Sequence, residues 1–247
     1  MTPPTQQYRL NHLHLVGTQE PSNATPRLAS VDEANLHLIY PDPDWDARTE
    51  AAQALRELGH ALVRHRTDET SLAQITEFAR RFSAHVATGR TVPRPDDYMP
   101  RRYTDDRPPD GARLVAFSDR PISGPANPMG MEIDLRRDGE GVRADVIFGP
   151  AFESAPGRAH GGSISAVVDD VMGYLMVVLG VAAYTAELTV RYEAGVPIDT
   201  PIRFEAHEVE RIGRKLHVEV RATAQGRQLV SAKGLFLIAP PESFTKS

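Results

Sequence analysis

Residues 160–179 read HGGSISAVVDDVMGYLMVVL, and this stretch decides the fold of the chain. It begins with His160-Gly161-Gly162, and almost every later position is apolar. We expect a helix from about Gly162 to Leu179. Because this helix is apolar on nearly every side, it has to be buried all round. One sheet that curls around a single central helix would bury it, and a second subunit could cover whatever the sheet leaves open.

The start of the expected helix has the features of a site for negative charge. Gly161 and Gly162 leave backbone N–H groups approachable, and such groups at a helix N-terminus bind anions. They can equally hold a carbonyl oxygen that becomes negative during acyl transfer. Asp169, a carboxylate inside the buried segment, can activate water. Together these groups predict hydrolysis of an ester or thioester.

Segments on both sides of the helix alternate apolar and polar residues, as half-buried strands do. Upstream, strand-like segments cover residues 114–117, 131–135 and 142–148, with a hairpin turn at 138–141. Downstream, they cover residues 186–194, 202–212, 216–224 and 228–238. The late segments are joined by short turns, so we expect antiparallel pairing. The predicted fold class is α+β, an antiparallel sheet wrapped around a long central helix.

The N-terminal part has a different pattern, and we place the domain boundary at residue 110. Residues 1–43 are polar and proline-bearing, with one β-like piece at Asn35–Tyr40. Apolar residues then recur on one helical face from Ala51 to Val63. We predict an N-terminal extension with a helical hairpin over residues 1–110 and a main domain over residues 111–247.

The second helix of this extension shows both start and stop signals. Ser71 and Gln74 have the spacing of a capping box at its start, and Gly89 is a plausible stop. Residues 90–111 are rich in proline, arginine and aspartate, and we interpret them as a connector.

The central motif resembles that of the hotdog fold, and more narrowly that of PaaI-like and THEM4/THEM5-type acyl-CoA thioesterases. The pattern of that family is His-Gly-Gly, an acid nine residues after the histidine, and a threonine that opens the next strand. Here these residues are His160-Gly161-Gly162, Asp169 and Thr185. The resemblance covers roughly residues 114–239, about half of the chain.

The resemblance implies hydrolysis of an acyl-CoA to free acid and CoA, with four catalytic residues. The Gly161 N–H would polarise the thioester carbonyl, and Asp169 would act as general base or nucleophile. Thr185 would orient the attacking water. His160 could transfer protons, or it could hold the loop through its ring nitrogens.

The expected substrate-binding residues are Asn127, Gly162, Arg211, Arg214 and Lys215. Two features of this set are similar to the family, the Asn127-Pro128 turn and the hairpin at Gly213-Arg214. The basic side chains beside that hairpin could hold CoA phosphates. Alternatively, these side chains are solvated charges at a turn and bind no ligand.

Helix geometry predicts that the site is shared between subunits. Gly161 and Asp169 lie eight residues apart, or about 12 Å along a helix. One carbonyl carbon cannot lie within about 3 Å of both groups when they come from the same helix. An antiparallel partner helix solves this, so we expect a homodimer, or dimers paired into a tetramer, with composite sites. An apolar tunnel at the interface would hold the acyl chain, and Met172, Leu175 and Met176 could line it; core packing is the commoner explanation for a methionine pair at helical spacing.

Composition excludes several classes of protein. The net charge is -5 over 247 residues, so no nucleic-acid partner is expected. The chain has no cysteine, which excludes disulfides, thiolate zinc sites and a cysteine nucleophile. The histidines show no metal-ligand spacing. No apolar run reaches the roughly 18–20 residues of a membrane span. We expect a cytoplasmic protein that needs no metal and no cofactor.

Several alternatives stay open. Asp169 could be an ion-paired interface residue, and its neighbour Asp170 is expected to make structural hydrogen bonds. Ser163 and Ser165 are weak candidates for a nucleophile because no G-x-S-x-G motif surrounds them. A non-catalytic acyl-CoA binding protein and a hydratase could use the same fold. Aryl, short-chain and long-chain acyl groups all fit the sequence.

Overall fold

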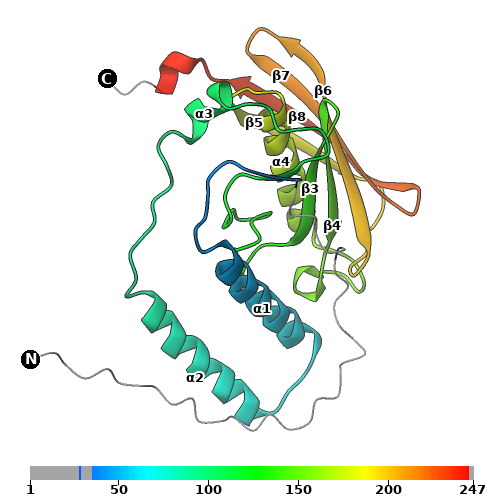
Figure 1. Cartoon of the computed structure of the whole chain (residues 1–247). Helices are drawn as coiled ribbons and strands as arrows, with labels where there is room; N and C mark the ends of the chain where they lie inside the picture. Colours follow the sequence, from blue (N-terminus) through cyan, green and yellow to red (C-terminus); the bar gives the residue numbers. More distant parts are fainter. Residues whose placement is uncertain (1–27, 29–34, 245–247) are drawn as a thin grey trace, which may run out of the picture.

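The structure is a computed structural model that describes residue 28 and residues 35–244. In this part of the chain one eight-stranded sheet curves around a long helix, and further helices lie on the N-terminal side (Figure 1). The strands are β1 (Leu36–Leu38), β2 (Arg113–Val115), β3 (Glu132–Asp138), β4 (Gly141–Ile147), β5 (Ala183–Tyr192), β6 (Pro201–Ile212), β7 (Lys215–Ala224) and β8 (Arg227–Ile238). The helices are α1 (Trp45–Arg64), α2 (Glu69–Val86), α3 (Tyr98–Thr104) and α4 (Gly161–Val178), with short 3-10 turns η2 (Pro150–Phe152) and η3 (Pro241–Phe244).

The strands follow the order β1-β2-β3-β4-β6-β7-β8-β5 across the sheet. Only the β1–β2 pair among the described strands is parallel, so the antiparallel pairing expected for the late strands is confirmed. β5 pairs with β8 and not with β6, the strand that follows it in the chain. Residues 193–200 carry the chain past the positions of β8 and β7 to reach β6. β5 therefore forms one edge of the described sheet.

Helix α4 supplies the centre of the core. It packs against β4, β5, β6 and β7. Its buried residues are Ile164, Val167, Val168, Asp170, Val171, Met172, Tyr174, Leu175, Met176 and Val178. The large side chains from the sheet that meet them include Phe148, Phe204 and Phe236. The predicted sheet around a long central helix is thus confirmed.

One face of α4 stays open, which corrects the expectation that this helix is buried all round. Gly162 and Asp169 are exposed, and Ser165, Ala166 and Gly173 are half-buried. These positions are three or four residues apart, so they form one stripe along the helix. The sheet covers only part of the helix circumference, and the uncovered stripe carries small residues and one carboxylate.

By length and composition, α4 could also cross a membrane. A little more than half of this 18-residue segment is buried inside the fold. The core helix of a globular domain has the same length and composition. The burial of α4 against four strands supports that interpretation.

The N-terminal part differs from the expectation in three details. The connector contains a helix, α3, since Tyr98 and the residues after it dock on the sheet domain. Helix α2 begins at Glu69, before Ser71, because the Asp68 side chain accepts the Ser71 N–H and caps the helix. It ends at Val86, three residues before Gly89. The β-like piece is confirmed as β1, while residues 1–27 and 29–34 lie outside the described residues.

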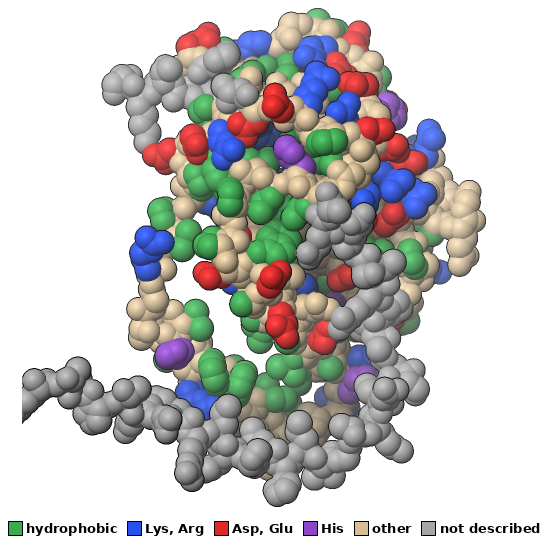
Figure 2. Space-filling view, in the orientation of Figure 1, with side chains coloured by type: hydrophobic (Ala, Val, Ile, Leu, Met, Phe, Trp, Pro, Cys, Tyr) green, Lys and Arg blue, Asp and Glu red, His purple; other side chains and the backbone are tan. Residues whose placement is uncertain are grey.

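Helices α1 and α2 follow one another, and α1 lies between α2 and the sheet (Figure 1). α1 packs on η2, where the backbone N–H of Ala151 donates to Nδ1 of His60 at 3.1 Å. Every residue of α2 is described, and none is buried. Hydrophobic side chains are visible at the surface over both helices (Figure 2). The division of the chain at residue 110 stays a prediction, and β1 from the first part joins the sheet of the second.

Candidate active site

The His160 side chain caps the start of α4. Its Nδ1 accepts the backbone N–H of Gly162 at 3.0 Å. The Gly162 donor is therefore occupied from within the turn. Among the described residues, none accepts a hydrogen bond from the N–H of Gly161. The turn thus leaves the N–H of Gly161, the residue expected to polarise a carbonyl, available to a ligand.

Tyr192 lies close to the glycine at position 161. A Cβ on Gly161 would lie 3.2 Å from the Tyr192 hydroxyl oxygen and 3.3 Å from the ring carbon that bears it. The same hydroxyl donates to the Gly161 carbonyl at 2.9 Å and lies 2.7 Å from the Ser165 hydroxyl. Sequence reasoning missed Tyr192, because a tyrosine at the end of a strand gives no spacing signal.

Asp169 and Thr185 meet directly. The Thr185 hydroxyl donates to Oδ1 of Asp169 at 2.9 Å. Asp169 lies on the open stripe of α4, and Thr185 lies near the start of β5, beside a β-bulge at Ala186. Bulges of this kind re-aim side chains next to active sites. Both side chains are exposed, so the expectation that the Asp169 carboxylate is buried is wrong for the single chain.

The neighbouring carboxylate, Asp170, has a structural environment. It is buried, and its Oδ1 accepts from Nε of Arg120 at 2.5 Å. Arg120 also donates to the Tyr98 hydroxyl at 3.2 Å and lies over the Tyr174 ring, 4.9 Å from its centre. Burial alone lowers the pKa of Arg120, but the charge of Asp170 outweighs this and raises it. The guanidinium therefore stays charged, and the pair ties α4 to the loop and to α3.

Asn127 holds its own loop. Its amide nitrogen donates to the carbonyls of Asp119 and Arg120 at 3.2 and 3.3 Å. Its carbonyl oxygen accepts the Met129 N–H at 2.8 Å. The structure thus places Asn127 where it positions Arg120, which pairs with Asp170.

The basic residues expected to bind phosphate lie at the turn between β6 and β7. Arg211 is paired with Glu208 at 2.9 Å, and Arg214 donates through Nε to the Ile238 carbonyl at 2.8 Å. Register places Leu216 opposite Phe236, which in turn faces Thr185. The turn between β6 and β7 therefore lies at the Thr185 end of β5. Two strand spacings, about 10 Å, separate Leu216 from Thr185 across the sheet.

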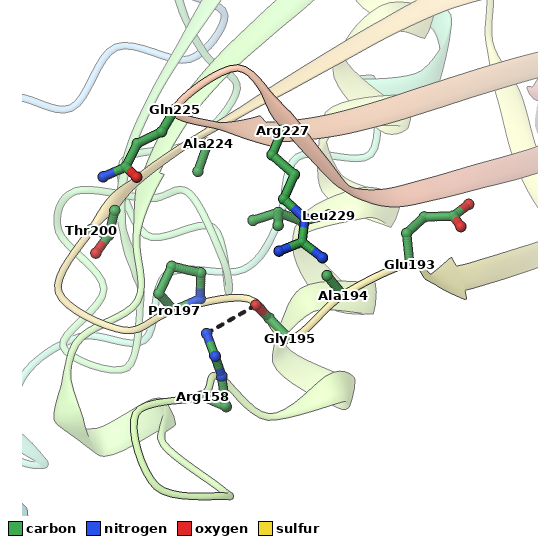
Figure 3. Close-up of a pocket in the computed structure, with 10 residues that line it drawn as sticks. All are labelled: Arg158, Glu193, Ala194, Gly195, Pro197, Thr200, Ala224, Gln225, Arg227 and Leu229. Carbon is green, nitrogen blue, oxygen red and sulfur yellow. Dashed lines mark hydrogen bonds between the residues drawn. The ribbon is translucent and has the colours of Figure 1, made fainter.

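A second basic position lies at the other end of β5. Arg158 and Arg227 border a cavity of about 710 Å³ (Figure 3). Arg158 donates to the Gly195 carbonyl at 3.2 Å, and the adjacent Ala159 N–H donates to the Val196 carbonyl at 2.9 Å. The cavity thus begins beside the His160 turn. Neither arginine could be singled out from the sequence, because they meet only through the fold.

The structure therefore divides the predicted site into two groups along α4. His160, Gly161 and Gly162 lie at the start of the helix, and Asp169 lies with Thr185 two turns later. Among the described residues, no group of His, Asp and Glu side chains could hold a metal ion. The single chain carries both groups, but they do not meet within it.

Part of this chain is similar to known proteins. Residues 156–231 match the family model of the thioesterase superfamily. The acyl-coenzyme A thioesterase THEM5 of Mus musculus is 33% identical over 92 residues, which cover 36% of this chain and 37% of the relative. THEM5 of Homo sapiens is 32% identical over 119 residues, covering 42% of this chain and 48% of the relative. The chain spans less than half the length of these relatives.

A solved structure extends the comparison of the fold. The crystal structure of a thioesterase superfamily protein matches 77% of this chain and 94% of its own, with a TM-score of 0.65 and 24% sequence identity. The part of the chain that carries the His-Gly-Gly turn thus has the hotdog fold, and residues 156–231 within it are similar to the thioesterase superfamily. The resemblance to THEM4/THEM5-type sequences is confirmed, since a THEM4 of Bos taurus also matches, with 27% identity over 118 residues.

Proposed function

We propose that this protein hydrolyses a fatty-acyl or aryl-acyl CoA thioester to the free acid and CoA. The observation that carries the proposal is the hydrogen bond between Thr185 and Asp169 on the open stripe of α4. A threonine hydroxyl beside an exposed carboxylate can hold a water molecule for attack. The approachable N–H of Gly161 supplies the donor that a developing oxyanion needs.

We further propose a homodimer in which two subunits complete each site. Two surfaces of the single chain support it. β5 presents an edge to which no described strand is bonded, and long free edges are avoided in stable monomers. The open stripe of α4 carries small residues that allow close approach of another helix. A two-fold axis between two such helices would bring Gly161 of one copy near Asp169 of the other.

The proposed hydrolysis uses water, the thioester and groups of the protein. Asp169 takes a proton from water while the water oxygen bonds to the thioester carbon. The carbonyl oxygen becomes negative and accepts the Gly161 N–H of the other subunit. Collapse of this intermediate breaks the carbon–sulfur bond, and CoA leaves as the thiolate and takes up a proton. If Asp169 instead attacks the carbonyl carbon, an acyl anhydride forms first and water then cleaves it.

Two basic positions are proposed for the CoA phosphates. Arg158 and Arg227 lie beside the Gly161 end of one subunit, and Arg214 and Lys215 lie at the Thr185 end. In an antiparallel dimer both positions border the same composite site. Planar guanidinium groups suit phosphate oxygens because they offer two parallel donors.

The test is CoA release, measured with a thiol reagent on a panel of acyl-CoA esters. The chain has no cysteine, so the protein gives no background signal. We expect Asp169→Ala to lower kcat about a hundredfold or more, the size expected for loss of a catalytic base. Asp106→Ala, a change at an exposed aspartate in the connector, is the matched control and should leave the rate intact. If the wild type binds acyl-CoA but releases no thiol, the non-catalytic binding function replaces the proposal.

A further inference from the structure

A cavity of about 570 Å³ opens beside Asp169, between α4 and the segment that leads into α3. Its lining residues are Arg94, Pro95, Asp96, Tyr98, Met99, Phe117, Arg120, Pro121, Ile122, Ala166, Asp169 and Asp170. A volume of this size is typical of a small-molecule site. Whatever occupies the cavity lies next to the carboxylate that the proposed reaction uses.

The walls of this cavity are largely apolar. Met99, Phe117 and Ile122 come from three separate segments, and the rings of Tyr98 and Phe117 lie 4.9 Å apart in a tilted arrangement. Tyr40 stacks on Phe117 from behind at 4.8 Å. An aromatic and aliphatic wall of this kind binds apolar groups through burial and ring contacts.

The charged groups around the cavity are paired with one another. Arg120 is held by Asp170, and Arg94 is held by Asp119 at 2.5 Å, with its guanidinium 4.5 Å from the centre of the Phe117 ring. The burial of Tyr98 raises its pKa, but Arg102 and Arg120 outweigh that effect and lower it. Asp169 also faces the cavity, where its Oδ1 accepts the Thr185 hydroxyl.

The segment that closes the cavity is anchored at several points. Tyr40 donates to Asp97 at 2.7 Å, and Arg102 donates to the Tyr98 hydroxyl. Arg102 also donates to the Gly173 carbonyl of α4 at 3.3 Å. The wall is therefore set before a ligand arrives, and its shape can select among ligands.

We propose that this cavity is the acyl-group site, and that the residues leading into α3 select compact apolar acyl groups, branched or aromatic. The paired Arg120 and Asp170 limit its depth, since an apolar chain gains nothing by lying against them. The inference rests on the proposed function, because it requires the thioester carbon to lie near Asp169. It gives the N-terminal extension a role in selecting the substrate.

The test compares two substrates on two variants. We expect Met99→Trp, which fills the cavity, to lower kcat/KM for phenylacetyl-CoA relative to acetyl-CoA by at least tenfold. Val92→Trp adds the same side chain at an exposed position of the same segment, outside the cavity, and should leave that ratio unchanged. An unchanged ratio in Met99→Trp would overturn the inference while leaving thioester hydrolysis intact.

A binding measurement separates the two proposals. Titration calorimetry with a thioether analogue of phenylacetyl-CoA, compared with CoA itself, reports the contribution of the acyl group without turnover. We expect the analogue to bind the wild type more tightly than CoA does, and Met99→Trp to lose most of that gain. If this pattern holds but no acyl-CoA is hydrolysed, the site is supported and the enzymatic function fails. If the analogue and CoA bind the wild type equally, the cavity does not hold the acyl group.

Discussion

At the residue scale, neighbouring side chains of the motif have separate tasks. His160 accepts the Gly162 N–H, while the N–H of Gly161 has no acceptor among the described residues. Asp169 faces the open stripe, whereas Asp170 is buried against Arg120. A rotation of about 100° per helical residue is enough to give two adjacent carboxylates opposite environments.

The cap at His160 can be tested separately from catalysis. Removing an N-cap side chain costs about 1 kcal/mol, so we expect His160→Ala to lower the free energy of unfolding by about that amount. Asn is a good N-cap, so His160→Asn should recover most of the loss. Urea denaturation measures the stability, and CoA release is measured on the same samples. Activity that returns together with stability in His160→Asn indicates a positioning role, and a stable but inactive His160→Asn indicates a direct role in the reaction.

At the element scale, pairs between separate segments hold the site in place. The Arg120–Asp170 pair joins α4 to the loop that Asn127 braces, and His60 joins α1 to η2. These contacts link parts of the chain that are far apart in sequence. Removing these contacts should therefore lower the stability of the fold and loosen the packing of these segments on one another before it affects the reaction.

Breaking the buried ion pair should be costly. Asp170→Asn leaves the Arg120 charge without its partner, and we expect a loss of about 3 kcal/mol in the free energy of unfolding. Replacing both residues, as in Arg120→Met with Asp170→Leu, removes both charges and should restore much of the stability. Denaturant titration of both variants tests this. A single variant as stable as the wild type would contradict the structural role of Asp170.

The contact of His60 with η2 should depend on pH. Burial lowers the pKa of His60; Asp199 opposes this, and Arg64 and Arg56 add to it. The folded chain thus binds a proton less readily than the unfolded chain, whose histidine titrates near 6.5. The stabilisation is complete above that pH and is lost as the pH falls below it.

Hydrogen exchange in α1 measures this effect. Protection should decrease between pH 7.5 and pH 5.5 in the wild type, because protonated Nδ1 can no longer accept the Ala151 N–H. His60→Gln provides the control, since its difference between the two pH values should be smaller. Equal pH dependence in both proteins would show that another group is responsible.

The element scale also separates what the sequence can predict from what it cannot. Period-two alternation located β3, β4 and the late strands, and the apolar run located α4. Alternation does not encode which strand is the neighbour of which, so the β5–β8 pairing could not be predicted. The link between Asp169 and Thr185 followed from the resemblance, whereas Tyr192, Arg158 and Arg227 meet their partners only through tertiary structure.

At the scale of the whole molecule, the proposed dimer brings the two groups of the site together from two copies. If each site combines the Gly161 end of one subunit with Asp169 of another, two inactive variants can complement each other. Random mixing of Gly161→Val and Asp169→Ala gives half heterodimers, each with one intact site. We expect about a quarter of the wild-type activity in such a mixture.

The control for complementation is a mixture in which both subunits carry Asp169→Ala, which should remain inactive. Sedimentation of the mixed sample shows whether subunits have exchanged. Exchange without recovered activity would rule out shared sites and require both groups to act within one chain.

The three-residue strand β1 limits how the sheet can grow. A sheet with two long exposed margins can add molecules at both ends and polymerise without limit. Within the described residues, β1 terminates one margin next to β2, and the β5 margin offers ten residues for pairing. Pairing of two such margins leaves a short strand at each outer end. If the proposed dimer forms through β5, this assembly would be self-terminating, and the short β1 at each outer end would disfavour growth into fibres.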